Sequence, residues 1–175
     1  MRFLRRLQKL VPVISEVGLH TIYEPRKKGL KKFGKLVYVS QKMDEVVRKA
    51  VKFALSDRTI LLLGETGTGK RLLAEEIHRI SGREGEFVKG KSAENDQLLQ
   101  STYFGHVKGA FTGAIKNKKG LFEIAHKGTL FIPDIENFSQ EAQAKLLTAI
   151  EEKEINRLGD EGNPRKVDVR LILDT

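Results

Sequence analysis

Residues Gly64–Lys70 read GETGTGK and combine three glycines with a lysine, residue types that can hold a phosphate group. The run before this loop, Thr59–Leu63, is continuously apolar, which favours a strand buried on both faces of a parallel sheet. Apolar residues at helical spacing follow the loop. In such a strand, loop and helix, backbone N–H groups at the helix N-terminus bind one phosphate and the lysine reaches the outer phosphates of a nucleotide. The sequence therefore predicts a nucleotide-binding site, with an ordinary tight turn as the alternative, formed by Gly64, Glu65, Thr66, Gly67, Thr68, Gly69, Lys70 and Arg71.

A second apolar run, Thr129–Ile132, predicts another buried strand, and Pro133 and Asp134 follow it directly. Transfer of a phosphoryl group to water uses carboxylates beside the phosphates, one to order Mg²⁺ and one to polarise the attacking water. Arg71 stands where a phosphate-binding loop usually has the Ser or Thr that ligates Mg²⁺, so the loop itself does not secure the metal.

The stretch Tyr103–Ala114 ends in GAFTGA, which places small residues on both sides of one aromatic and one hydroxyl side chain. Glycine and alanine give a pliant, hairpin-like tip, and we expect Phe111 and Thr112 to be exposed there. An exposed aromatic side chain on a flexible tip is a typical anchor for a protein partner. The alternative is that Phe111 folds back into the core. The residues of this candidate contact site are Gly109, Ala110, Phe111, Thr112, Gly113 and Ala114.

The phosphate loop and GAFTGA, in this order, resemble the AAA+ domain of the bacterial enhancer-binding proteins that activate sigma-54 RNA polymerase. The resemblance continues through Gly120–Phe131 and through the QAKLL segment Gln143–Leu147, and it covers roughly Leu36–Thr175. It implies an α/β fold in which helices sandwich a parallel P-loop AAA+ sheet. It also implies ATP as the ligand, Mg²⁺ as its metal, and a GAFTGA loop that contacts sigma-54. Assembly into an AAA+ homo- or hetero-oligomer is implied as well.

The catalytic positions of this family differ in the present chain. The family ends the second acidic strand with Asp-Glu, in which Asp orders Mg²⁺ and Glu polarises the attacking water, whereas this chain has Pro133 and Asp134. The resemblance therefore makes Asp134 the candidate for both the catalytic and the metal-binding role. In a direct alignment proline replaces the metal-ordering acid, and in an alignment shifted by one residue Ile135 replaces the water-activating acid. Neither register restores two carboxylates, and Glu136 is the nearby acid that could compensate. Lys91 falls at or beside the position of an Asn that restrains the catalytic Glu in the family. A further hypothesis is that Arg71 and Lys91 compensate for the lost metal by placing positive charge near the phosphates.

Outside these motifs the resemblance sets the expected organisation. Ser40 is expected to cap a helix that precedes the phosphate-loop strand, and another helix is expected to begin near Ser139, after Asp134. In the family, a sensor Asn, arginine fingers, a fifth strand, a helical lid and usually a DNA-binding helix-turn-helix follow the segment matched here. We expect the sequence to stop before them. Because the fifth strand flanks the phosphate-loop strand, Thr59–Leu63 is expected to form an open apolar edge unless another segment covers it.

Composition and charge divide the chain. A length of 175 residues with 39% hydrophobic residues suits one globular domain. There is no cysteine and no apolar run near the ~18 residues of a membrane span, which favours a cytoplasmic protein. Residues 1–35 carry ten Lys or Arg and two Glu, and hence most of the net charge of +9. We therefore expect a basic leader at 1–35, either binding an anionic partner or merely solvated, and a partial sigma-54 interaction AAA+ domain at 36–175.

Two functions remain open at this stage. The first is an ATP-binding sigma-54 interaction domain that regulates transcription through contact of its GAFTGA loop with sigma-54 RNA polymerase. The second is a non-hydrolysing nucleotide-binding module, or a degenerate remnant, that acts as a partner or inhibitor of a full-length AAA+ activator. The resemblance implies an ATPase, whereas the altered carboxylate pair and the expected absence of sensor and arginine fingers argue against hydrolysis.

Overall fold

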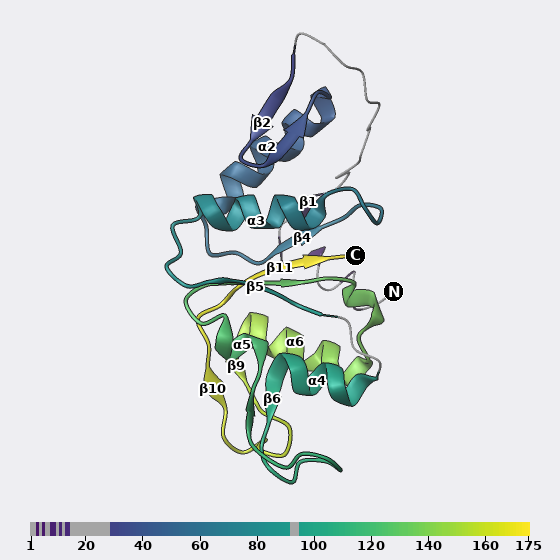
Figure 1. Cartoon of the computed structure of the whole chain (residues 1–175), viewed down its shortest axis with the longest axis vertical. Helices are drawn as coiled ribbons and strands as arrows, with labels where there is room; N and C mark the ends of the chain where they lie inside the picture. Colours follow the sequence, from purple (N-terminus) through teal and green to yellow (C-terminus); the bar gives the residue numbers. More distant parts are fainter. Residues whose placement is uncertain are drawn as a thin grey trace.

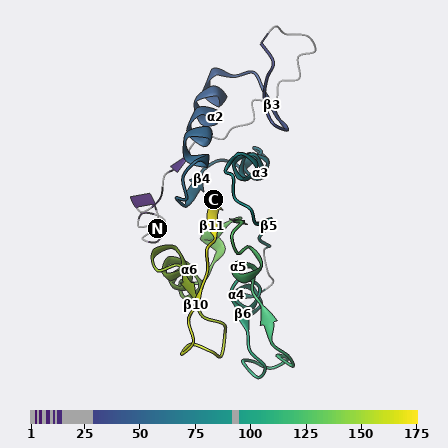
Figure 2. The same cartoon turned by 90° about the vertical axis from the view of Figure 1, so that its left-hand side faces the viewer.

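The computed structural model describes residues 29–91 and 95–175, together with residues 3, 5, 8, 9, 11, 13 and 14. A five-stranded sheet in the order β1-β4-β11-β8-β5 forms the middle layer, and every pair of neighbouring strands in it is parallel. Helices α2 and α3 cover one face and α4, α5 and α6 the other (Figures 1 and 2). This arrangement confirms the expected α/β sandwich.

The elements follow one another along the chain with these bounds. The main sheet contains β1 (Val13–Ile14), β4 (Ile60–Leu62), β5 (Phe87–Lys89), β8 (Thr129–Ile132) and β11 (Arg170–Asp174). The helices are α2 (Gln41–Ala54), α3 (Lys70–Ile80), α4 (Asp96–Phe104), α5 (Leu121–Ile124) and α6 (Gln140–Glu151), with a 3-10 turn η1 (Ile135–Asn137). Three small antiparallel hairpins are β2–β3 (Lys31–Phe33 and Leu36–Tyr38), β6–β7 (Gly105–His106 and Lys118–Lys119) and β9–β10 (Glu154–Ile155 and Arg165–Lys166).

Local sequence explains where two of the helices start. The Ser40 hydroxyl accepts the Met43 N–H at the start of α2, and the Ser139 hydroxyl accepts the Ala142 N–H at the start of α6. The Ser40 cap and a helix start near Ser139 were expected, and serine at such a start satisfies an N–H group that has no partner within the helix. No helix in the described part of the chain is both long and apolar enough to cross a membrane.

The apolar residues form two cores, one on each face of the sheet. Helices α2 and α3 pack on one face through residues such as Val46, Ala50 and Leu73. The opposite core contains Phe104, Phe122 and Leu146 from α4, α5 and α6. Strands β4, β8 and β11 are buried along their whole length, which agrees with a parallel sheet covered on both sides.

The sheet edge beside β4 is occupied, so of the two alternatives left open for this edge, an exposed apolar strand and a strand covered by another segment, the structure shows the second. Val13 and Ile14 pair with Leu61 and Leu62 in parallel register. Val11, just before this short strand, is buried in the core below the sheet. The N-terminal segment therefore supplies the neighbouring strand, which sequence alone could not indicate, because two apolar residues carry no periodic pattern.

The β2–β3 hairpin spans position 35, where the sequence analysis divides the chain, and rests on α3. The carboxylate of Glu76, buried within α3, accepts the Lys35 N–H at 2.8 Å and the Arg79 Nε–H at 2.6 Å. Gly34 adopts φ 58°, and a Cβ there would lie 1.7 Å from the Glu76 Oε2. The tight turn and the close approach both require glycine at this position.

The β6–β7 and β9–β10 hairpins extend together from the layer formed by α4, α5 and α6 (Figure 1). The Val107 N–H donates to the Leu158 carbonyl at 3.1 Å, and the Leu158 N–H donates to the Gly105 carbonyl at 3.0 Å. A Cβ on Gly159 would lie 2.9 Å from the Cβ of Ala110, so the two hairpin loops are in close contact. A change in the position of one loop must therefore be accommodated by the other.

An ion pair holds the base of these loops. Arg157, just after β9, donates from Nε to Glu123 Oε1 at 2.8 Å and from a terminal nitrogen to Oε2 at 2.7 Å. Burial opposes the charge of Glu123, but the hydrogen bonds and charge of Arg157 keep the pKa of this carboxyl below its usual value. This bidentate geometry fixes the β9–β10 loop to α5.

The N-terminal strand should protect the sheet edge. Val13→Pro combined with Ile14→Pro removes two backbone N–H donors, so we expect about 1–3 kcal/mol of lost stability and more aggregation. Urea unfolding and light scattering measure both effects. The matched variant Val13→Thr with Ile14→Thr keeps the N–H groups and should be affected less. Equal losses in the two variants would contradict a role for β1 pairing.

The Glu123–Arg157 pair should make stability depend on pH. Because the folded pKa of Glu123 is lowered, its contribution is complete above the unfolded pKa and is lost as pH falls through the folded value. Glu123→Gln should cost roughly 3 kcal/mol at pH 7, and its difference from the unaltered chain should shrink below about pH 4. Denaturant titrations at several pH values test this, with the exposed Glu152→Gln as control. A difference that stays constant from pH 7 to pH 3 would rule out the pair as its source.

Candidate functional site

The phosphate-loop residues lie at the carboxyl end of the sheet. Strand β4 ends at Leu62, the loop follows, and α3 begins at Lys70. Gly69, which immediately precedes α3, has φ 87°, in the left-handed region that favours glycine. The positive end of the α3 dipole faces the loop, which is the arrangement that binds anions. The strand, loop and helix expected from the sequence are all present.

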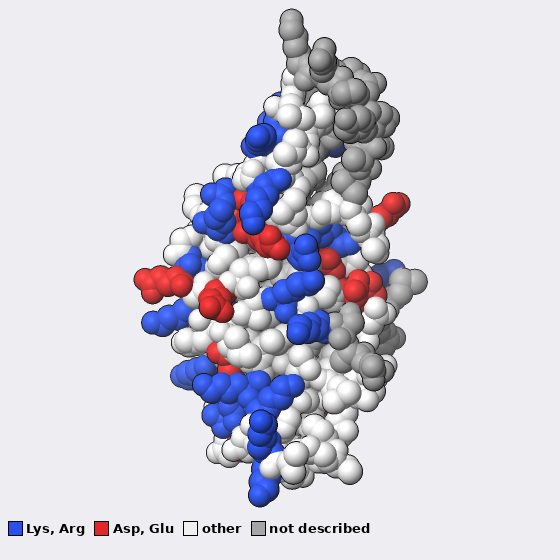
Figure 3. Space-filling view, in the orientation of Figure 1, with Lys and Arg blue, Asp and Glu red and all other residues white. Residues whose placement is uncertain are grey.

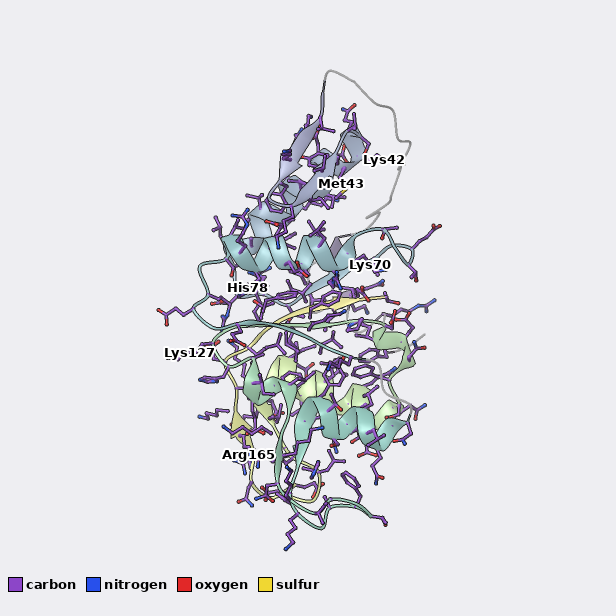
Figure 4. All side chains as sticks on the ribbon, viewed as in Figure 1. Lys42, Met43, Lys70, His78, Lys127 and Arg165 are labelled. Carbon is purple, nitrogen blue, oxygen red and sulfur yellow. The ribbon has the colours of Figure 1, made fainter. Side chains whose placement is uncertain are left out.

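A cavity of about 380 Å³ opens beside this loop. Its walls come from the loop and α3, from the start of the segment after β8, and from the end of β11. Figure 4 labels Lys70 at the start of α3, on the side that faces the sheet. The lining residues are Thr66, Gly67, Thr68, Gly69, Lys70, Arg71, Leu72, Lys89, Phe131, Pro133, Asp134 and Asp174.

Lys70 is buried, with 8% of its side chain exposed, and points back along its own loop. Its Nζ donates to the Gly64 carbonyl at 2.5 Å and to the Glu65 carbonyl at 3.1 Å. Thr68 closes the same turn, because its hydroxyl donates to the Glu65 carbonyl at 2.7 Å. The lysine is therefore held in the cavity wall by carbonyl dipoles that a phosphate could replace.

Two carboxylates meet in this cavity. Asp134 has φ 49°, and its N–H donates to Asp174 Oδ1 at 2.9 Å. The other oxygen of Asp174 lies 3.9 Å from the Lys70 Nζ. Burial raises the pKa of Asp174; the Asp134 N–H and Lys70 oppose the shift, and the charges of Asp134 and Glu136 add to it. The cavity thus brings together the buried ammonium group of Lys70, the acid that follows β8 and the acid at the end of β11, with Lys89 of β5 also in its wall.

The remaining residues that the sequence suggested for the phosphate site differ in position, and only some of them line the cavity. Arg71 lines the cavity but is exposed, with its Nε 3.6 Å from Glu75 Oε1 on the next turn of α3. Pro133 lines the cavity and offers no side-chain oxygen. Glu136 and Lys91 are exposed and are not among the lining residues. The described residues therefore offer Asp174, rather than Glu136, as the second acid.

The GAFTGA segment forms the loop between β6 and β7, at the end of the molecule farthest from α2 (Figure 1). The Gly109 N–H donates to the Ala114 carbonyl at 2.8 Å, which closes the loop, and Gly109 and Gly113 have φ 84° and 97°. Thr112 is exposed as expected. Phe111 is only partly exposed, because its ring packs edge-on against His106 with centroids 5.0 Å apart. The expectation of a freely exposed Phe111 therefore needs this correction.

Two further features of the site were not predicted from the sequence. Asp174 is the last residue of an apolar strand, and a lone acid there has no signature before the neighbouring strands are known. Ile115 follows GAFTGA and is 83% exposed, so it enlarges the apolar surface of the loop. Exposed lysines surround this end of the molecule, where Figure 3 shows Lys and Arg side chains gathered over the two hairpins; they are Lys108, Lys116, Lys118, Lys119 and Lys166.

Comparison with known proteins matches this architecture. Residues 36–175 match the model of the sigma-54 interaction domain. The chain is 45% identical over 149 residues to a Nif-specific regulatory protein of Herbaspirillum seropedicae, covering 84% of the chain and 27% of that protein. It is 44% identical over 179 residues to the transcriptional regulatory protein FlgR of Helicobacter pylori, covering 94% of the chain and 47% of FlgR. The chain thus spans less than half the length of either relative.

A solved structure shares the fold. NtrX from Brucella abortus in complex with ATP superposes with a TM-score of 0.70 at 30% identity, over 81% of this chain and 30% of NtrX. The corresponding complex of NtrX with ADP gives a TM-score of 0.71 at 29% identity, over 82% of this chain and 31% of NtrX. Taken with the phosphate loop and the GAFTGA loop, these matches show that the chain belongs to the sigma-54 interaction domain family of transcriptional regulators.

Proposed function

We propose that this domain binds ATP in the cavity beside Gly64–Lys70 and contacts sigma-54 RNA polymerase through its GAFTGA loop. The observation that carries the nucleotide part is the buried Lys70 at the N-terminus of α3, held by the Gly64 and Glu65 carbonyls inside a cavity of about 380 Å³. A phosphate entering the cavity would meet the ammonium group, loop N–H groups and the helix dipole together. The ATP complex of the related NtrX supports the same ligand.

The donor set of the cavity fits a magnesium ion that accompanies the nucleotide. Magnesium usually keeps several waters and takes one or two carboxylates together with substrate phosphates. Asp134 and Asp174 supply two carboxylates here, whereas no group of three or more His, Asp or Glu in the described ranges forms a self-contained metal site. When bound, the ion would neutralise charge on the phosphates. The role of the protein would be to hold Lys70, Asp134 and Asp174 beside the phosphates.

The sigma-54 part of the proposal rests on the shape of the loop. Thr112 and Ile115 are exposed, Phe111 is half-buried against His106, and a hydrogen bond joins the two ends of the motif. This presents a small apolar and hydroxyl surface on a closed loop, which is suited to docking on another protein. Contact with the β9–β10 loop gives the presented loop a second support.

A second candidate is a non-hydrolysing module that binds nucleotide and associates with other AAA+ chains, as a partner or inhibitor of a full-length activator. The observation that favours it is Pro133 in the cavity wall, where the family has a carboxylate. Asp134 is a shorter acid than the family's Glu, and Glu136 is exposed. Measuring phosphate release beside nucleotide binding separates this candidate from an active ATPase.

Lys70 should be needed for nucleotide binding. Lys70→Ala removes the buried ammonium group, so we expect affinity for a fluorescent ATP analogue to fall at least about tenfold. Fluorescence titration measures the affinity, and phosphate release is followed on the same samples. The control is Lys49→Ala, which removes an exposed lysine of α2. Equal affinity in the two variants would show that the cavity is not the nucleotide site.

The loop side chains should be needed for binding to sigma-54 polymerase. Phe111→Ala and Thr112→Ala should each weaken binding by about 1–2 kcal/mol, because they remove the aromatic and hydroxyl groups of the loop tip. Co-sedimentation with the polymerase in the presence of an ATP analogue measures this effect. Leu55→Ala is the control, since Leu55 is 78% exposed at the end of α2, in the opposite layer. A comparable loss for Leu55→Ala would argue against a specific role of the loop.

A further inference from the structure

The acid at the end of β11 is in the position to replace a missing carboxylate. Strand β11 lies between β4 and β8, with Leu173 paired to Ile132 and Asp174 paired to Leu62. Asp174 is therefore one residue beyond the last pair with β8, level with Pro133. Parallel strands end at the same edge of a sheet, so an acid at this register enters the same cavity as a side chain at the end of β8.

We propose that Asp174 is the carboxylate that orders Mg²⁺ beside the nucleotide, taking the place that Pro133 leaves without an acid. This inference rests on the proposed nucleotide binding. It is based on the observation that Lys70, Asp134 and Asp174 line the same cavity. Magnesium needs few protein ligands when phosphates supply the others, so one acid at the correct register is sufficient.

The contacts of Asp174 leave one of its carboxylate oxygens near the ammonium group of Lys70. Oδ1 accepts the Asp134 N–H at 2.9 Å, which fixes the carboxylate plane. Oδ2 lies 3.9 Å from the Lys70 Nζ, beyond a hydrogen bond but within the range of an ion pair. The side chain is 8% exposed, so it has lost most of its contact with bulk water. A buried acid in such a position is costly unless a cation compensates it.

Nucleotide binding would change this balance of charge. If Lys70 turns to the phosphates, Asp174 shares the ammonium group of Lys70 with a strongly anionic ligand. Two anionic groups in one buried cavity repel each other, and a divalent cation between them removes the repulsion. The carboxylate thus makes nucleotide binding depend on the metal. Removing its charge should relax this dependence.

Asp134 and Glu136 fit the role less well. Asp134 lies beyond the end of β8, with a left-handed backbone at φ 49° and a half-buried side chain. Its N–H supports Asp174, so its own position is tied to the acid of β11. Glu136 is exposed on η1 and does not line the cavity. Asp174 is the more deeply buried of the two acids in the cavity wall.

The test measures the affinity of the full chain for a fluorescent, non-hydrolysable ATP analogue, once in Mg²⁺ and once in EDTA. The variants are Asp174→Asn, Asp134→Asn and Glu136→Gln, with thermal unfolding as a check on the fold. Asparagine keeps the acceptor for the Asp134 N–H and removes the charge. We expect Mg²⁺ to strengthen binding to the unaltered chain about tenfold or more, and Asp174→Asn to lose most of that gain. In EDTA this variant should bind at least as tightly as the unaltered chain.

Other results would overturn the proposal. An unchanged gain from Mg²⁺ in Asp174→Asn would exclude it, and so would loss of the gain in Asp134→Asn alone. If the unaltered chain binds the analogue equally in Mg²⁺ and EDTA, no acid orders the metal and the inference fails while nucleotide binding stands. If it binds in neither condition, the proposed nucleotide function itself fails.

A measurement on the unaltered chain covers the case in which Asp174→Asn does not fold. With ¹³C-labelled aspartate and glutamate, Mn²⁺ added in place of Mg²⁺ in the presence of the analogue should broaden the carboxyl resonance of Asp174 first. The resonance of the exposed Glu136 serves as the internal reference. Broadening of Asp134 before Asp174 would assign the metal to Asp134 and overturn the proposal.

Discussion

The parallel pairing of β11 with both β4 and β8 is the constraint on which the site depends. It brings three strand ends to one edge of the sheet: the end that opens into the phosphate loop, the end that leads to Pro133 and Asp134, and the end that carries Asp174. A shift of one residue in either pairing would turn these side chains to the opposite face. The full burial of all three strands between two helical layers makes such a shift costly.

The same sheet edge is joined by packing to the layer that carries the GAFTGA loop. The segment after Asp134 passes through η1 to Phe138, whose ring lies 5.2 Å from that of Tyr103 in α4. Helix α4 then leads directly into Gly105 and the loop. Burial raises the pKa of the Tyr103 hydroxyl and keeps it neutral, in keeping with a structural role for this ring. The cavity beside the phosphate loop and the GAFTGA loop are therefore connected through a short series of packed groups.

The N-terminal segment also contributes to the sheet. Val13 and Ile14 complete the edge of β4, and the β2–β3 hairpin is fixed to α3 by Glu76. Both contacts involve elements next to the phosphate loop, since β4 precedes it and α3 follows it. The segment that the sequence presents chiefly as a source of positive charge thus also supports the framework of the site. The pattern of charged residues in the sequence reveals the positive charge of this segment. Its structural role becomes visible only from the strand pairing.

The sequence by itself determined the strand, loop and helix around Lys70, the serine caps and the GAFTGA loop, because each depends on neighbours close along the chain. It also indicated that Pro133 offers no acid where the family has one. Only the tertiary structure decided which other acid lines the cavity. Asp174 reaches the cavity because β11 lies between β4 and β8, and Val13 meets Leu61 across 48 positions of chain. Phe111 turned toward His106 for the same reason, since contacts between distant or folded-back segments depend on packing that no local pattern records.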